Sequence, residues 1–205
     1  MFNEVLQART GLRLVAWRAL ISGGAGAGAG AVWGVLIGGV GGRVAMRVVF
    51  LTSDDRLRGL TSDDGFEIGR FSGETVALLM ITAVLGAHGG FLFGILRLGW
   101  AGPRWAVMSA AAVAMGAAAG GTIVHLTGID FVFLEPLWLT VSLFVVILAA
   151  WGAAVAATME SGWRFTADLP GRPQRWQRGP IGWAVVAGMT AWGVIELIDD
   201  IRQLR

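Results

Sequence analysis

Two arginines in GGRVAMR have the most evident capacity to bind a ligand. Arg43 and Arg47 lie four residues apart, so on a helix they share one face. Such a pair can hold an anionic headgroup or substrate, or pair with an acid such as Glu196 near the chain end. The alternative is interfacial anchoring, in which the long side chains extend to water. Glu196 is equally open to an interfacial position or an arginine partner.

His88 lies in GAHGG, where neighbouring glycines would let a backbone, a water molecule or a cofactor approach closely. We expect a hydrogen-bonded interior residue. A proton-relay or ligand role is the alternative, because polar groups inside membrane spans tend to be functional. His125 lies near the end of the next apolar stretch. Haem between two imidazoles needs both at similar depth, whereas His88 lies well inside its apolar stretch and His125 near the end of the next. This difference in depth argues against haem, and the sequence predicts no cofactor.

The acids gather in TSDDRLRGLTSDDG, in which TSDD occurs twice. Each tetrad has the form of a capping box, where a hydroxyl and a carboxylate satisfy free N–H groups at a helix start. A cation site would need several converging oxygens, and the alternating acid spacing of an EF-hand loop is missing. We therefore expect caps and turns, and no metal site. The acids concerned are Asp54, Asp55, Asp63, Asp64 and Glu67.

The elements that must position these residues are apolar helices. Of 205 residues, 55% are hydrophobic and 15% charged, a balance typical of chains that face lipid. Five apolar stretches are each long enough to cross a bilayer as a helix. The sequence therefore predicts a single all-α domain, a polytopic transmembrane bundle. Its expected spans are 19–42, 75–96, 105–126, 137–158 and 181–198, with an outer polar loop at 43–74 and an inner basic loop at 159–180.

The basic residues are all arginine, and their placement predicts the orientation. Cytoplasmic segments carry an excess of positive charge. Arginines cluster in the N-terminal segment and in the second and fourth connections, whereas the connection at 127–136 has none. We expect a cytoplasmic N-terminus and a multi-pass protein of the inner membrane. Absence of Lys, with abundant Ala and Gly, indicates a bacterial source. Arginines spread between apolar runs, rather than on one polar face, exclude nucleic-acid binding.

Small residues recur at every fourth position of two stretches, as a helix interface in lipid requires. This glycine-zipper pattern predicts tight packing within the chain or between copies. The first stretch also contains GGAGAGAG, which can bend or unwind. In that case the crossing would shift to about 31–51 and place both arginines inside the membrane. The packing residues are Ser22, Gly26, Gly30, Gly34, Gly38, Gly42, Gly86, Gly90 and Gly94.

Three functions remain open on these grounds. The first is a non-catalytic accessory, assembly or scaffold protein, whose partners are the bilayer and other transmembrane helices in a homo-oligomer or a larger complex. The second is a small transporter or channel with an outward-facing arginine and carboxylate site. The third, a membrane-embedded enzyme acting on lipid, has the least support, because no nucleophile arrangement can be assigned.

Overall fold

The computed structural model describes residues 2–52, 73–100, 102–122, 136–165 and 179–203. Every regular element within these ranges is a helix. One isolated parallel bridge joins Trp100 to Gly179. The described part of the chain is therefore all-α, as the sequence predicts.

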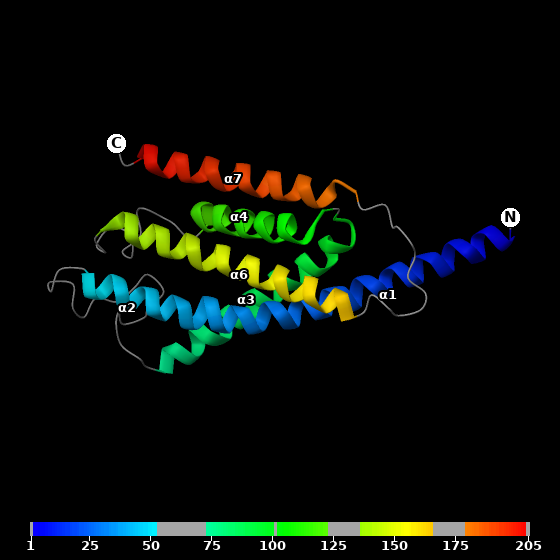
Figure 1. Cartoon of the computed structure of the whole chain (residues 1–205), viewed down its shortest axis with the longest axis horizontal. Coiled ribbons are helices and arrows are strands. Elements are labelled where there is room, and N and C mark those ends of the chain that lie inside the picture. Colours follow the sequence, from blue (N-terminus) through cyan, green and yellow to red (C-terminus); the bar gives the residue numbers. More distant parts are fainter. Residues whose placement is uncertain (1, 53–72, 101, 123–135, 166–178, 204–205) are drawn as a thin grey trace.

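The chain from Phe2 to Thr52 forms one long helical rod (Figure 1). It consists of α1 (Phe2–Trp33), the π-helix η1 (Gly34–Gly41) and α2 (Gly42–Thr52). At 1.5 Å per residue such a rod measures about 75 Å. A bilayer core is only about 30 Å thick, and the N-terminal part of α1 extends beyond the other helices (Figure 1). Only part of the rod can therefore lie within a membrane.

Helix α3 (Gly73–Leu98) crosses α1 with the backbones in direct contact. A Cβ built on Gly30 would overlap the carbonyl oxygen of Gly86 and lie 2.9 Å from the Cα of Gly90. The relation is mutual, since a Cβ on Gly90 would overlap the carbonyl oxygen of Gly26. GGAGAGAG remains helical throughout, because this close packing offsets the low helix propensity of glycine.

The remaining helices form a second group, in which α4 (Arg104–Thr122) lies between α6 (Leu137–Phe165) and α7 (Ile181–Gln203) (Figure 1). Small residues again allow close approach. A Cβ built on Gly152 of α6 would lie 2.7 Å from the carbonyl oxygen of Ala111. A Cβ on Gly193 of α7 would overlap the carbonyl of Ala117.

A proline directly precedes each helix of this second group. Proline suits a helix start because its missing N–H would have no intrahelical acceptor there. The carbonyl of Pro103 accepts from the N–H of Val107 at 3.1 Å, and that of Pro180 from Ala184 at 2.9 Å. Pro136 does the same for α6, which begins at Leu137, where the fourth span is expected to start.

Two tryptophans join the groups where α6 packs on the rod. Trp151 donates from Nε1 to the carbonyl oxygen of Gly30 at 3.2 Å, inside the protein. Trp33 donates from Nε1 to Oγ1 of Thr158 at 2.8 Å. Trp151 also lies against Gly89 of α3, so one indole contacts both helices of the first group.

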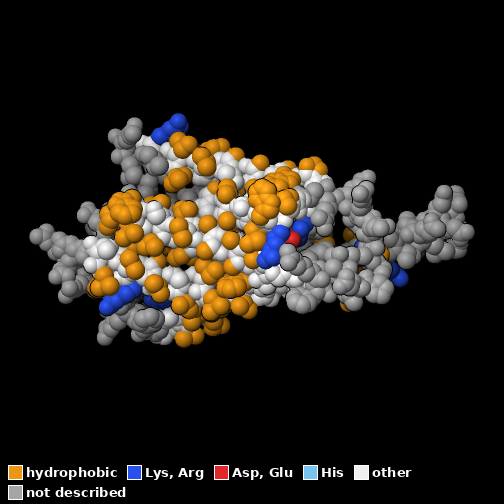
Figure 2. Space-filling model, viewed as in Figure 1, with side chains coloured by type: hydrophobic (Ala, Val, Ile, Leu, Met, Phe, Trp, Pro, Cys, Tyr) orange, Lys and Arg blue, Asp and Glu red, His pale blue; other side chains and the backbone are white. Residues whose placement is uncertain are grey.

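The outer surface is strongly apolar. Figure 2 shows hydrophobic side chains over the middle of the described surface and basic side chains toward its ends. Within the described ranges, four helices are long and apolar enough to cross a membrane, whereas the apolar stretch of α4, Arg104–Ala118, is shorter. Only 11% of the most apolar window of α3 is buried within the protein. Because so much exposed apolar surface is unfavourable in water, the fold is that of a membrane protein.

Two connections are shorter than the sequence predicts. Residues 43–52 were expected in the outer loop and are helical, because Ala45 and Val49 are buried and Val49 packs with Leu143 of α6. Likewise residues 159–165 were expected in the inner loop, yet they continue α6, where Met159 is buried. Residues 53–72 and 166–178 of these loops, and residues 123–126 of the third expected span, lie outside the described residues.

We predict opposite effects of alanine at two glycines of this fold. Gly90→Ala places a methyl group against the backbone of Gly26, and such overpacking lowers the free energy of unfolding by about 1–3 kcal/mol. Gly28→Ala is the matched control, because a Cβ there has nothing within 4 Å, so stability is unchanged or raised by up to about 1 kcal/mol. Unfolding of both variants in detergent provides the measurement. Equal stability of the two would contradict direct backbone contact at Gly90.

Candidate functional site: a buried ion pair where the helices converge

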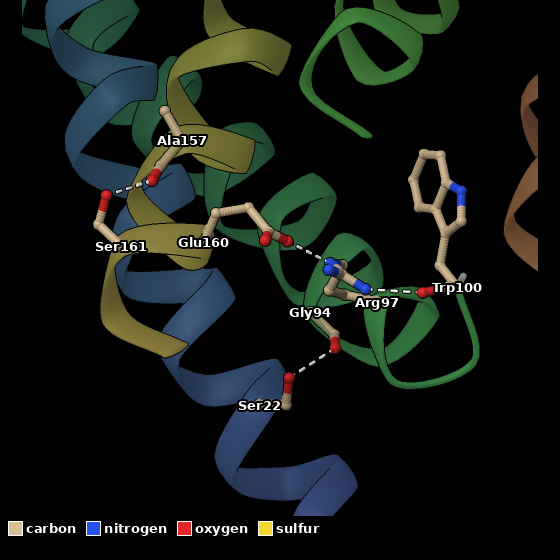
Figure 3. A network of polar contacts seen from close by, with 7 residues as sticks. All are labelled: Ser22, Gly94, Arg97, Trp100, Ala157, Glu160 and Ser161. Atoms are coloured by element: carbon tan, nitrogen blue, oxygen red, sulfur yellow. Dashed lines mark hydrogen bonds and ion pairs between the residues drawn. The ribbon is translucent and has the colours of Figure 1, made fainter. Parts of the chain in front are cut away.

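A polar cluster lies where α3 and α6 end and α4 begins (Figure 3). Arg97, in the last turn of α3, donates from Nε to Oε1 of Glu160 on α6. The Arg97 and Glu160 side chains are 8% and 11% exposed. An arginine at a helix C-terminus is favoured by the helix dipole, whereas a carboxylate there is not. Glu160 therefore depends on Arg97 for compensation.

Arg97 also holds the turn that follows α3. Its Nη1 donates to the carbonyl oxygen of Trp100 at 2.7 Å. The buried Trp100 ring packs edge-on against Phe93 and Trp183, with centroid distances of 6.1 and 5.6 Å. Gly182, at the start of α7, leaves room for this ring, because a Cβ there would overlap it. One guanidinium thus links α3, α6 and, through Trp100, α7.

Hydroxyl groups extend the cluster to α1 and α4. Ser22 of α1 donates to the carbonyl oxygen of Gly94 at 2.6 Å, at a buried position. Arg104, the first residue of α4, donates from Nη2 to Oγ of Ser161 at 3.3 Å. Ser161 in turn donates to the carbonyl oxygen of Ala157 at 2.8 Å. These bonds hold the ends of α3 and α6 and the start of α4 against one another and against the interior of α1, an arrangement suited to holding the bundle together.

The predicted arginine pair divides between two environments. Arg43 is buried, with 7% of its surface exposed, whereas Arg47 is exposed. The guanidinium of Arg47 lies 5.4 Å from the centroid of the Phe50 ring, within cation–π range. An exposed arginine packed along its own helix fits the anchoring interpretation of Arg47. The burial of Arg43 fits a role inside the protein.

His88 does not lie in the interior, so that expectation is wrong. It is exposed on α3, and its Nδ1 lies 2.8 Å from the carbonyl oxygen of Val84 on the same helix. The glycines beside it face the other way: Gly89 and Gly90 contact Trp151 and α1, respectively. The sequence identified the close approach correctly but could not tell on which side of α3 it occurs.

Glu196 accepts a hydrogen bond from Nε1 of Trp192 at 3.2 Å, on the exposed surface of α7. Asp199, another acid of α7, bonds to Arg202 at 3.3 Å on the same helix. The interfacial interpretation of Glu196 therefore fits the structure better than an arginine partner. His125 and the acids Asp54, Asp55, Asp63, Asp64 and Glu67 lie outside the described residues.

The sequence analysis missed Glu160 as a site residue, although a signal for it exists. It is the only acid between Glu135 and Asp168. An isolated acid at the end of an apolar stretch needs a cation at the same depth, and Arg97 ends a neighbouring stretch at that side. No group of three His, Cys, Asp or Glu residues within the described ranges is arranged to hold a metal ion.

No family model, curated protein or solved structure matches this chain.

We predict that Arg97→Gln or Glu160→Gln alone lowers the free energy of unfolding by about 3–5 kcal/mol, because each leaves a buried charge without its partner. The double variant Arg97→Met/Glu160→Leu regains most of that loss, since no charge remains. Arg202→Gln is the control, because the Arg202 and Asp199 side chains are 75% and 55% exposed and little change is expected. Denaturation in detergent measures all four. A double variant less stable than either single variant would contradict the pairing.

Proposed function

We propose that this chain is a non-catalytic membrane protein with an accessory, assembly or scaffold role, exerted through helix packing. The observation that carries this proposal is a second series of small residues on the outer side of α1. Gly24 and Gly28 are exposed, and a Cβ on either would have nothing within 4 Å. Large apolar side chains flank them, including Ile21 and Val32, which are 55% and 56% exposed.

Such a surface suits another transmembrane helix. In lipid, helices associate where small residues let their backbones approach, and two glycines four residues apart are the usual arrangement. The contact between α1 and α3 supports the same principle within this chain, as a glycine zipper built on Gly26, Gly30, Gly86 and Gly90. The partner is a helix of a second copy or of a larger membrane complex.

We further propose five membrane crossings, with α4 as the crossing that lies between α6 and α7. Its buried alanines face those helices rather than lipid, so α4 needs less apolar surface than an outer helix. Successive crossings alternate in direction. The N-terminus, Arg97 and Arg104 then lie on one side, which the positive-inside rule places in the cytoplasm of a bacterial inner membrane.

A small transporter or channel is the second candidate, and buried Arg43 is the observation that favours it. Arginines inside membrane proteins are costly and usually functional. Arg43 lies two residues beyond the end of η1, and π-helical turns inside α-helices occur frequently at functional sites. Glutamine at Arg43 should then abolish transport while leaving expression intact.

We predict that Gly28→Leu weakens association without unfolding the protein. The leucine fills open space on α1, so the melting temperature stays within a few degrees of the native value while the partner helix is kept away. Sizing chromatography with light scattering, and recovery of the native complex from membranes, provide the measurements. Gly162→Leu is the control, because a Cβ there also meets nothing within 4 Å, near the end of α6. An unchanged complex in Gly28→Leu would contradict the scaffold role of α1.

The orientation is tested by cysteine labelling, which is clean because the chain contains no cysteine. Asp130→Cys should react with an impermeant maleimide on intact cells, whereas Arg172→Cys should react only after permeabilisation, because the two positions lie in connections on opposite sides. The reverse pattern would overturn the orientation.

A further inference from the structure

The outward face of α3 is apolar except at its centre. Ile81, Leu85 and Leu92 are 51%, 65% and 60% exposed, and His88 is exposed among them. Helices α1 and α6 pack on the opposite side of α3, where Gly86, Gly89 and Gly90 lie. His88 is therefore a single polar group on a face that no described helix covers.

The geometry of His88 fixes what this group offers a partner. Its Nδ1 lies 2.8 Å from the carbonyl oxygen of Val84, and a carbonyl only accepts. Nδ1 therefore carries the hydrogen, and Nε2 of the neutral ring is an acceptor. The bond to Val84 is the one polar contact of His88 in the described part of the chain. Nε2 is thus left without a donor.

The depth of His88 makes this acceptor costly. It lies near the middle of the apolar segment Thr75–Leu98, about 15–20 Å from either end. An imidazole is too short to reach an interface from there. With α3 crossing a bilayer, as the proposed topology requires, Nε2 would face hydrocarbon, where an unsatisfied polar group is unfavourable.

We propose that the outward face of α3 binds the same face of a second copy, with the two His88 side chains meeting at a two-fold axis along the membrane normal. Such an axis places every residue opposite its own equivalent at equal depth. An unrelated helix would need a polar group at that depth, whereas a second copy has one by symmetry. Ile81, Leu85 and Leu92 likewise meet apolar equivalents.

The two imidazoles form one hydrogen bond across the axis by adopting different tautomers. One ring keeps its Nδ1–H bond to Val84 and accepts at Nε2. The other ring carries its hydrogen on Nε2 and donates across the axis, so its Nδ1 turns away from the Val84 carbonyl and gives up that bond. No further titratable side chain is needed: the other one within Thr75–Leu98 is Arg97, which is buried against Glu160. This contact is separate from the Gly24 and Gly28 surface on α1.

Cysteine cross-linking in proteoliposomes tests the contact. Leu85→Cys and Leu92→Cys, which flank His88, should form disulfide-linked dimers on mild oxidation, since the native chain contributes no cysteine. Val146→Cys on α6 is the matched control, because Val146 is 61% exposed and lies on another helix. Cross-linking at Leu85 and Leu92 no greater than at Val146 would overturn the proposal.

Substitution of His88 tests the hydrogen bond. Energy transfer between labelled copies, measured over a range of protein-to-lipid ratios, should give a dimer association constant about 3- to 20-fold lower for His88→Leu, the range of interhelical hydrogen bonds in membranes. His88→Gln should restore association, because an amide both donates and accepts. Association of His88→Leu as tight as native would overturn the proposal. Cross-links should persist in Gly28→Leu, so loss of the α1 contact is distinguishable from failure here.

Discussion

The packing of α1 against α3 depends on the absence of side chains between their backbones. In lipid no hydrophobic effect draws helices together, so the attraction must come from dispersion and hydrogen bonds over short distances. Gly30, Gly86 and Gly90 supply that proximity, and any Cβ among them would overlap a neighbouring carbonyl or lie within 3 Å of it. The same open backbone gives the indole of Trp151 access to the carbonyl of Gly30. The glycines therefore determine where α6 attaches as well as where α3 crosses.

A group of polar contacts joins the described helices where α3 and α6 end and α4 begins, and this position follows from electrostatics. A buried ion pair is costly in the middle of a membrane, whereas near a helix end the desolvation is smaller and free backbone groups are available. Arg97 uses both conditions, because it compensates Glu160 and also binds the carbonyl of Trp100 beyond the end of α3. Ser22 and Arg104 add α1 and α4 at the same level. The polar contacts around Arg97 thus add to the glycine packing that aligns the helices.

The sequence predicts the helices well because lipid makes apolar length the dominant signal. The spacing of the small residues is likewise read directly from the sequence. It cannot assign faces. Gly26 and Gly28 belong to the same low-complexity run, yet one packs on α3 and the other is open to the exterior. His88 was placed inside by its glycine neighbours, although those glycines turn toward the opposite side. Glu160 was assigned to a loop because a charge suggested a span end, and only the structure brings its partner from another helix. Faces and partners are tertiary properties.

The π-helix η1 follows from the same glycine packing. Residues four apart drift by about 40° around an α-helix at each step, so a long series of small residues gradually turns away from its partner. A π-helix has more residues per turn, which counteracts that drift. Gly34 and Gly38 accordingly both face Thr82 of α3: a Cβ on Gly34 would overlap the Thr82 carbonyl, and one on Gly38 would lie 3.4 Å from the Thr82 Cβ. Once α2 begins at Gly42 the helix is regular again, and Ala45 and Val49 pack inward, with Val49 against Leu143 of α6. Buried Arg43 therefore lies in the first turn of the regular helix α2, just beyond the glycines that contact α3.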